Sequence, residues 1–196
     1  LLAAVLVFPC EALADSAKHA ILLDADTGRV IYEKSADEQA LIASTTKIMT
    51  ALIVCEQCNV LDRMRIPKEA VGIEGSSMYL REGEVLTIQE LLYGLMLHSG
   101  NDAAVAMAER IGGTEEEFVK MMNKKAQELG LQDTNFKNPH GLPVANHYSS
   151  AYDMALIAKE LVKHEEIFKY TTIYEDYLRE NTDNKFWLVN TNKTRC

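Results

Sequence analysis

The feature that most constrains this chain is a mostly apolar run over residues 48–54, preceded directly by Ser44-Thr45-Thr46-Lys47. The run predicts a buried helix. Ser44 would then lie at the N-terminus of that helix, with Lys47 one turn further along on the same face. This geometry can place an amine beside a hydroxyl at the positive end of the helix dipole, as an activated serine nucleophile needs. A simpler role also fits the tetrapeptide, in which Ser44 caps the helix and Lys47 faces solvent.

A second polar motif, Ser99-Gly100-Asn101, lies between two segments with helical patterns. A loop at this position can direct both polar side chains into a cleft. The Ser99 hydroxyl could relay a proton, and the Asn101 amide could donate to a substrate carbonyl. The alternative is ordinary capping, in which Ser99 or Asn101 begins the next helix and Gly100 permits the turn.

Composition limits the class of protein. The chain has 196 residues, of which 47% are hydrophobic and 25% charged, with a net charge of −9. This is enough for one domain with a substantial core. Because Lys and Arg are not clustered, we predict no nucleic-acid partner.

The N-terminal segment has the pattern of a processed targeting sequence. Residues 1–8 are apolar, and Ala12-Leu13-Ala14 fits a small-x-small cleavage site. We therefore predict a partial signal peptide over residues 1–14 and an exported mature chain over 15–196. A first buried strand or helix is the alternative. The run is too short to span a membrane, and no other segment is a candidate.

Cys55-Glu56-Gln57-Cys58 falls at the end of the expected helix that begins at Ser44. A redox Cys-x-x-Cys is expected at a helix start, where the thiol pKa is lowered. A structural zinc site would need a second pair of ligands. We therefore predict neither a metal nor another cofactor.

The remaining pattern predicts an α+β fold, with a helical cluster packed on a partial antiparallel sheet. Two strands with turn residues between them form an N-terminal hairpin, which needs further strands for stability. Three helices begin with capping-box patterns. The expected elements are the hairpin 20–32, strands at 64–67 and 186–189, a loop over 72–83, and helices starting at 44, 87, 103, 114 and 150.

Together the two polar motifs resemble the serine penicillin-interacting enzymes, which combine Ser-x-x-Lys, Ser-x-Asn and Lys-Thr-Gly. The chain is most similar to the D-alanyl-D-alanine carboxypeptidases among the low-molecular-mass penicillin-binding proteins. The similarity runs from about residue 20 to 192. It includes the segments 22–28, 43–50, 97–103, 138–142 and 147–153.

This resemblance implies a β-lactamase/transpeptidase-like fold and a set of roles. Ser44 would be the nucleophile that forms an acyl-enzyme, and its backbone N–H would be half of the oxyanion hole. Lys47 would be the general base, Ser99 would pass protons to the leaving amine, and Asn101 would hold the substrate's backbone amide. The substrate would be the peptidoglycan pentapeptide, cleaved at D-Ala-D-Ala in the periplasm or on the outer face of the bacterial cytoplasmic membrane. β-Lactams would acylate Ser44.

The third motif departs from the family pattern, because Arg195 follows Lys193-Thr194 where a Gly is required. We therefore expect residues 15–196 to be the N-terminal part of the catalytic domain, without its C-terminal strands, any later β-domain or a C-terminal membrane anchor. Without the Lys-Thr-Gly strand we expect weak activity or none.

Three alternatives remain. The first is a catalytically dead paralogue that binds or regulates the cell wall. The second is a β-lactamase, which would need a base for the deacylating water, but residues 140–148 contain no Glu. The third is a helical domain whose motifs are only caps. In all cases His140 and His147 are expected to organise a loop.

Overall fold

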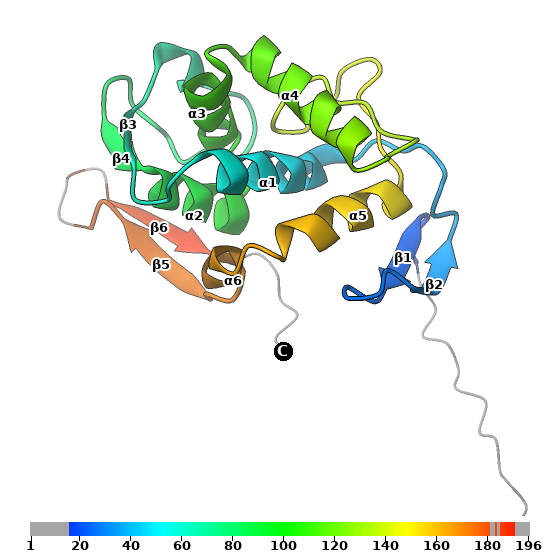
Figure 1. Cartoon of the computed structure of the whole chain (residues 1–196). Coiled ribbons are helices and arrows are strands. Elements are labelled where there is room, and N and C mark those ends of the chain that lie inside the picture. The colour runs from blue at the N-terminus through cyan, green and yellow to red at the C-terminus, as the bar shows by residue number, and fades with distance from the viewer. Residues whose placement is uncertain (1–15, 181–182, 184, 191–196) are drawn as a thin grey trace, which may run out of the picture.

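In the computed structural model, which describes residues 16–180, 183 and 185–190, the apolar run forms the central helix (Figure 1). Helix α1 (Lys47–Gln57) is buried continuously from Met49 to Val54. It packs against all four of the other long helices, which explains why this stretch is apolar apart from Thr50. The predicted buried helix is therefore confirmed.

Three of the four helices around α1 begin at their predicted caps, and α3 (Asn101–Gly112) begins two residues before its predicted start. Thr87 forms a complete capping box with Glu90, while Thr114 and Ser150 each accept a hydrogen bond from the backbone N–H three residues on. These caps satisfy amide groups that the first turn leaves without partners. The helices are α2 (Ile88–His98), α3 (Asn101–Gly112), α4 (Glu115–Glu128) and α5 (Ala151–Leu161).

Within the described residues, the strands form three separate two-stranded antiparallel ladders and not one sheet. They are β1 (Ala20–Leu23) with β2 (Val30–Lys34), β3 (Arg63–Arg65) with β4 (Val85–Thr87), and β5 (Glu175–Leu178) with β6 (Phe186–Val189). The short helix α6 (Glu166–Thr171) and strands β4 and β5 were not predicted from the sequence. The α+β class is confirmed, and the expected partial sheet is distributed over these ladders around the helices.

The N-terminal hairpin lies at the edge of the helical cluster, where β1 packs on α5 (Figure 1). Asp24 closes its turn by accepting hydrogen bonds from the backbone N–H and the hydroxyl of Thr27. In the described part of the chain no third strand joins the hairpin, and Leu22 and Ile31 are each more than half exposed.

None of the helices in the described residues is long and apolar enough to cross a lipid bilayer.

Candidate active site

The structure brings Ser44 and Lys47 together, as predicted. Residues Ala43–Thr46 form a 3₁₀ turn that leads directly into α1 at Lys47. The Nζ of Lys47 donates a hydrogen bond to Ser44 Oγ at 3.2 Å. Ser44 differs from the expectation in one respect, since it lies in the preceding turn and does not cap the α-helix. The simpler role of a helix cap beside a solvated lysine is therefore wrong.

Lys47 is 3% exposed. Burial disfavours the charged ammonium and lowers the pKa of Lys47 from 10.5 to about 8. Burial alone accounts for this pKa shift, and no charged group in the described part of the chain opposes it. A neutral amine in contact with a hydroxyl can accept its proton, so Lys47 has the geometry and the pKa of a base for Ser44.

The second motif forms the joint between α2 and α3. Ser99 ends α2 with a left-handed backbone (φ 58°), and Asn101 is the first residue of α3. The helix cap of α3 is Gly100, with no side-chain hydrogen bond, so the capping alternative is wrong. The Oγ of Ser99 is buried and has no hydrogen-bond partner among the described residues. It therefore does not contact Ser44 or Lys47 by hydrogen bonding in this structure.

A cavity of about 290 Å³ opens beside Ser44 and Asn101. Its walls come from the turn before α1, the start of α3 and the loop that precedes α5. Most of its surface is apolar, as is usual for a pocket that binds a small ligand through a few polar groups. The lining residues are Leu41, Ile42, Ala43, Ser44, Asn101, His140, Gly141, Leu142, Pro143 and His147.

The neighbour of Asn101, Asp102, was not singled out from the sequence. Its carboxylate is 1% exposed. It accepts hydrogen bonds from the Ser77 hydroxyl (2.7 Å) and from the backbone N–H groups of Met78 (3.0 Å) and Leu80 (3.1 Å). Asp102 therefore fastens the predicted loop 72–83 to the start of α3, next to the cavity.

Asn101 holds the same loop, because its Nδ2 donates to the carbonyl of Glu74 at 2.6 Å. Its backbone N–H donates to the carbonyl of Ser76 at 2.7 Å. The loop packs closely here, since a Cβ at Gly75 would lie 2.7 Å from Asn101 Nδ2. The orientation of Asn101 is thus set by the loop as well as by its helix.

His140 and His147 both organise the neighbouring loop. His147 Nδ1 accepts from the Lys137 N–H at 3.0 Å, which leaves Nε2 to donate to the Thr46 hydroxyl at 2.8 Å. His140 Nδ1 accepts from the Leu142 N–H at 3.1 Å. Burial lowers the pKa of both rings, that of His140 to about 4 with help from the nearby Lys47 charge. Both histidines are therefore neutral near pH 7.

Cys55 lies in the last turns of α1 and Cys58 just beyond it. Burial raises the pKa of Cys55 to about 12 and also raises that of Cys58, which disfavours the reactive thiolate. In the described ranges, no group of three or more His, Cys, Asp or Glu side chains could hold a metal ion.

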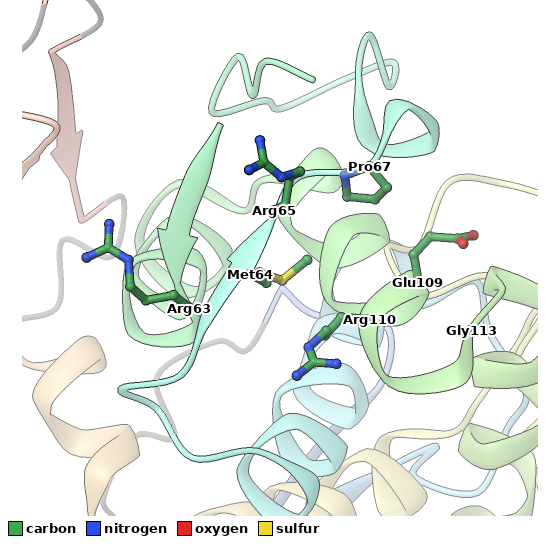
Figure 2. A pocket seen from close by; sticks show the side chains of 7 residues that line it. All are labelled: Arg63, Met64, Arg65, Pro67, Glu109, Arg110 and Gly113. Atoms are coloured by element: carbon green, nitrogen blue, oxygen red, sulfur yellow. The ribbon is translucent and has the colours of Figure 1, made fainter. Parts of the chain in front are cut away.

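A second hollow of about 440 Å³ lies between β3 and the end of α3, and it shares no lining residue with the cavity at Ser44 (Figure 2). Arg63, Arg65 and Arg110 line it. Figure 2 shows their guanidinium groups pointing away from one another, so they do not converge on one anion. It contains no nucleophile paired with a base.

Comparison with known proteins identifies the family of the chain that carries this site. The family model for D-alanyl-D-alanine carboxypeptidases matches residues 8–195. The chain belongs to this family. It is 56% identical over 186 residues to the D-alanyl-D-alanine carboxypeptidase DacF of Bacillus subtilis, covering 92% of this chain and 48% of DacF. It is 36% identical over 194 residues to DacC of Escherichia coli, covering 93% of this chain and 48% of DacC.

Solved structures of the family share the fold. The D-alanyl-D-alanine carboxypeptidase DacD of Francisella tularensis superimposes with a TM-score of 0.83 at 33% identity, covering 89% of this chain and 44% of DacD. The Streptomyces K15 DD-transpeptidase gives 0.83 at 30% identity, covering 90% of this chain and 74% of that chain. The chain spans about half the length of the curated relatives it matches. Membership in this family argues against a helical domain whose motifs are only caps.

Proposed function

We propose that the protein is a serine-type D-Ala-D-Ala carboxypeptidase that cleaves the terminal residue from peptidoglycan stem peptides. The observation that carries this proposal is the contact between Lys47 Nζ and Ser44 Oγ at 3.2 Å beside the cavity, with the pKa of Lys47 lowered to about 8. Its family and the names of its relatives support the same substrate class.

In the proposed reaction, neutral Lys47 takes the proton of Ser44 Oγ as the oxygen attacks the carbonyl of the penultimate D-Ala. The backbone N–H of Ser44 donates to the oxyanion. The C–N bond then breaks, and the terminal D-Ala leaves with a proton that passes through Ser99. Water hydrolyses the ester on Ser44 and restores the hydroxyl. Asn101, at the cavity wall, holds the backbone amide of the substrate.

β-Lactams would acylate the same oxygen, because opening the lactam ring follows the same attack on a carbonyl. The ring nitrogen takes the place of the leaving amine, but it stays tethered to the acyl group. This makes a β-lactam a direct probe of the proposed nucleophile.

A polypeptide restricted to residues 1–196 should be weakly active or inactive. The resemblance assigns the second oxyanion donor and a carboxylate-binding lysine to a Lys-Thr-Gly strand, and the sequence 1–196 contains no Lys-Thr-Gly. Loss of one oxyanion donor costs roughly 10²–10³ in rate in other acyl-transfer enzymes.

The protein should be exported to the periplasm or the outer face of the cytoplasmic membrane, where its substrate lies. The apolar residues 1–8 and the Ala12-Leu13-Ala14 pattern support this proposal; they lie outside the described residues. Mass determination of the mature protein from a secreting host tests it. Export predicts an N-terminus at Asp15, and an uncleaved chain retained in the cytoplasm would contradict it.

The function is tested by intact-mass spectrometry after incubation with benzylpenicillin, with the protein expressed from its complete gene. We expect one covalent adduct on the parent and none on Ser44→Ala. Absence of an adduct on folded parent protein would favour a non-catalytic protein that binds the cell wall. Fast turnover of a chromogenic β-lactam would instead indicate a β-lactamase, although residues 140–148 contain no Glu to activate the deacylating water.

A further inference from the structure

A tight turn over residues 138–142 forms one wall of the cavity, and a single buried side chain organises it. The Oδ1 of Asn138 accepts hydrogen bonds from the backbone N–H groups of His140 (3.3 Å) and Gly141 (2.6 Å). Its Nδ2 donates to the carbonyl of Leu142 at 2.9 Å. Because Asn138 is only 7% exposed, these bonds do not compete with bulk water, and the turn has a fixed shape.

This turn is joined to α1 through two consecutive carbonyl groups. The carbonyl of His140 accepts from Lys47 Nζ at 2.7 Å, and the carbonyl of Pro139 accepts from the Thr50 hydroxyl at 2.6 Å. Lys47 and Thr50 are three residues apart and therefore lie on the same face of α1. The position of the Lys47 amine thus depends on the backbone of the turn.

Gly141 brings the turn into direct contact with the residues before the nucleophile. Its φ of +91° belongs to the region that residues with a Cβ rarely adopt. A Cβ at this position would overlap the carbonyl of Ala43 and lie 3.0 Å from the backbone nitrogen of Ser44. Both neighbours are main-chain atoms, so no side-chain rotation could relieve the overlap.

Ala43 itself has a φ of +44°, in the left-handed region. Residues with a Cβ rarely adopt such a backbone, and it persists only where the surroundings enforce it. The close packing of Gly141 supplies that enforcement. The direction in which the Ser44 side chain projects from the backbone is therefore set by Gly141, almost one hundred positions later in the sequence.

We propose that Gly141 is a positioning residue for the nucleophile: the absence of its side chain lets the turn 138–142 close on the Ala43–Ser44 peptide while the adjoining His140 carbonyl holds Lys47 against Ser44 Oγ. This inference rests on the proposed function. It adds that one main-chain contact sets the orientation of the oxyanion N–H, the attacking oxygen and the base together.

The test compares Gly141→Ala with Gly130→Ala in the protein expressed from its complete gene, using the rate of acylation by a fluorescent penicillin per folded molecule. Gly130 is the matched control, because its φ is +73° but nothing lies within 4 Å of a Cβ there. Both variants place alanine in a left-handed backbone. We expect Gly141→Ala to lower the acylation rate about 100-fold, the effect of a displacement on the order of 1 Å at a reacting centre. Gly130→Ala should acylate like the parent.

The pH dependence of acylation separates positioning from a general loss of stability. His140 and His147 are neutral at alkaline pH because their pKa values are lowered, so a midpoint near pH 8 reports Lys47. In Gly141→Ala the displaced turn admits water to the amine, and we expect the midpoint to move to higher pH. A variant with only fewer folded molecules would keep the parental midpoint.

Asn138 provides a second test if Gly141→Ala does not fold. Asn138→Ala removes all three bonds within the turn and should lower the acylation rate at least roughly tenfold, with the same shift of midpoint. Asn138→Asp keeps the acceptor for both N–H groups but replaces the donor to the Leu142 carbonyl with an acceptor, so it should recover only part of the rate. A parental rate and midpoint in Gly141→Ala, or in Asn138→Ala where the first variant is unfolded, would overturn the inference. Failure of the proposed function is distinct, because then the parent itself forms no adduct.

Discussion

Replacing Lys47 with Met should stabilise the folded protein at pH 7 and abolish acylation. Lys47 is buried, and its pKa falls from 10.5 to about 8. Each pH unit of such a difference corresponds to about 1.4 kcal/mol, so keeping Lys47 protonated in the fold costs about 3 kcal/mol. Met has a similar length and no charge, and it avoids this cost.

The variant also loses the hydrogen bond from Lys47 Nζ to the carbonyl of His140. The carbonyl of His140 is left without its donor, which costs roughly 1–2 kcal/mol for a buried group. At pH 7 the net gain is therefore about 1–2 kcal/mol. For a domain of this size, 1 kcal/mol corresponds to roughly 2–4 °C in Tm.

The difference in unfolding free energy between Lys47→Met and the parent changes sign with pH. In the unfolded chain Lys47 keeps its proton up to about pH 10.5, whereas in the folded protein it releases that proton above about 8. Between these values the unfolded chain holds more protons, so the stability of the parent rises with pH relative to Lys47→Met. The full penalty applies below pH 8, and by about pH 10.5 it is gone. At that pH the variant should be the less stable protein.

Thermal unfolding followed by circular dichroism at pH 7, 8, 9 and 10 measures the difference between parent and variant. Lys124→Met is the control, since the Lys124 side chain is 77% exposed on α4. Its difference from the parent should not change across this range. A difference between parent and Lys47→Met that is constant with pH would refute the assignment of a desolvated, readily neutralised Lys47.

Three further outcomes are expected. Asp102→Ala should destabilise the protein by at least roughly 2 kcal/mol and speed hydrogen exchange at the Met78 and Leu80 amides, because these amides lose their acceptor. Unchanged exchange would contradict the conclusion that Asp102 holds the loop 72–83 to the start of α3. Gly94→Ala should cost about 1–3 kcal/mol of unfolding free energy because its Cβ would overlap Met78, and the double variant with Met78→Ala should be less destabilised in urea unfolding than the sum of the two single variants. Cys55, with its pKa raised from 9.0 to about 12, has a thiolate fraction at pH 8 on the order of 10³-fold below that of a free thiol and should react with iodoacetamide correspondingly slowly; rapid labelling of the folded protein would show that its thiolate is accessible.

The parts of the fold that sequence patterns predicted are those with local causes. The caps at Thr87, Thr114 and Ser150 are local hydrogen bonds, and the helices after them begin as expected. Strand β5 (Glu175–Leu178) was missed because only Leu178 in it is buried, so no apolar run marks it. Strand β5 forms by pairing with β6, and its own short sequence contains no pattern that predicts this pairing.

The candidate site likewise contains some contacts that local sequence predicts and others that it does not. Ser44 and Lys47 are three residues apart, so helical geometry alone indicates their contact. The left-handed Ala43 and the contacts made by His140 and Gly141 join segments more than ninety residues apart, and no local pattern encodes them. Gly141, flanked by His and Leu, can be seen in the sequence. Its role depends on which backbone atoms it contacts, and only the folded structure shows that contact.

Lys47, the proposed base, is held by a main-chain carbonyl, that of His140, and this limits which substitutions can change the contact. Every residue type carries that carbonyl, so substitutions of residue 140 itself do not delete the contact. Under the proposed function, a variant that avoids acylation by a β-lactam through this contact would have to reshape the backbone, through Gly141 or Asn138. The same backbone would orient Ser44 for the proposed peptide substrate, so we expect such a variant to lose carboxypeptidase activity as well.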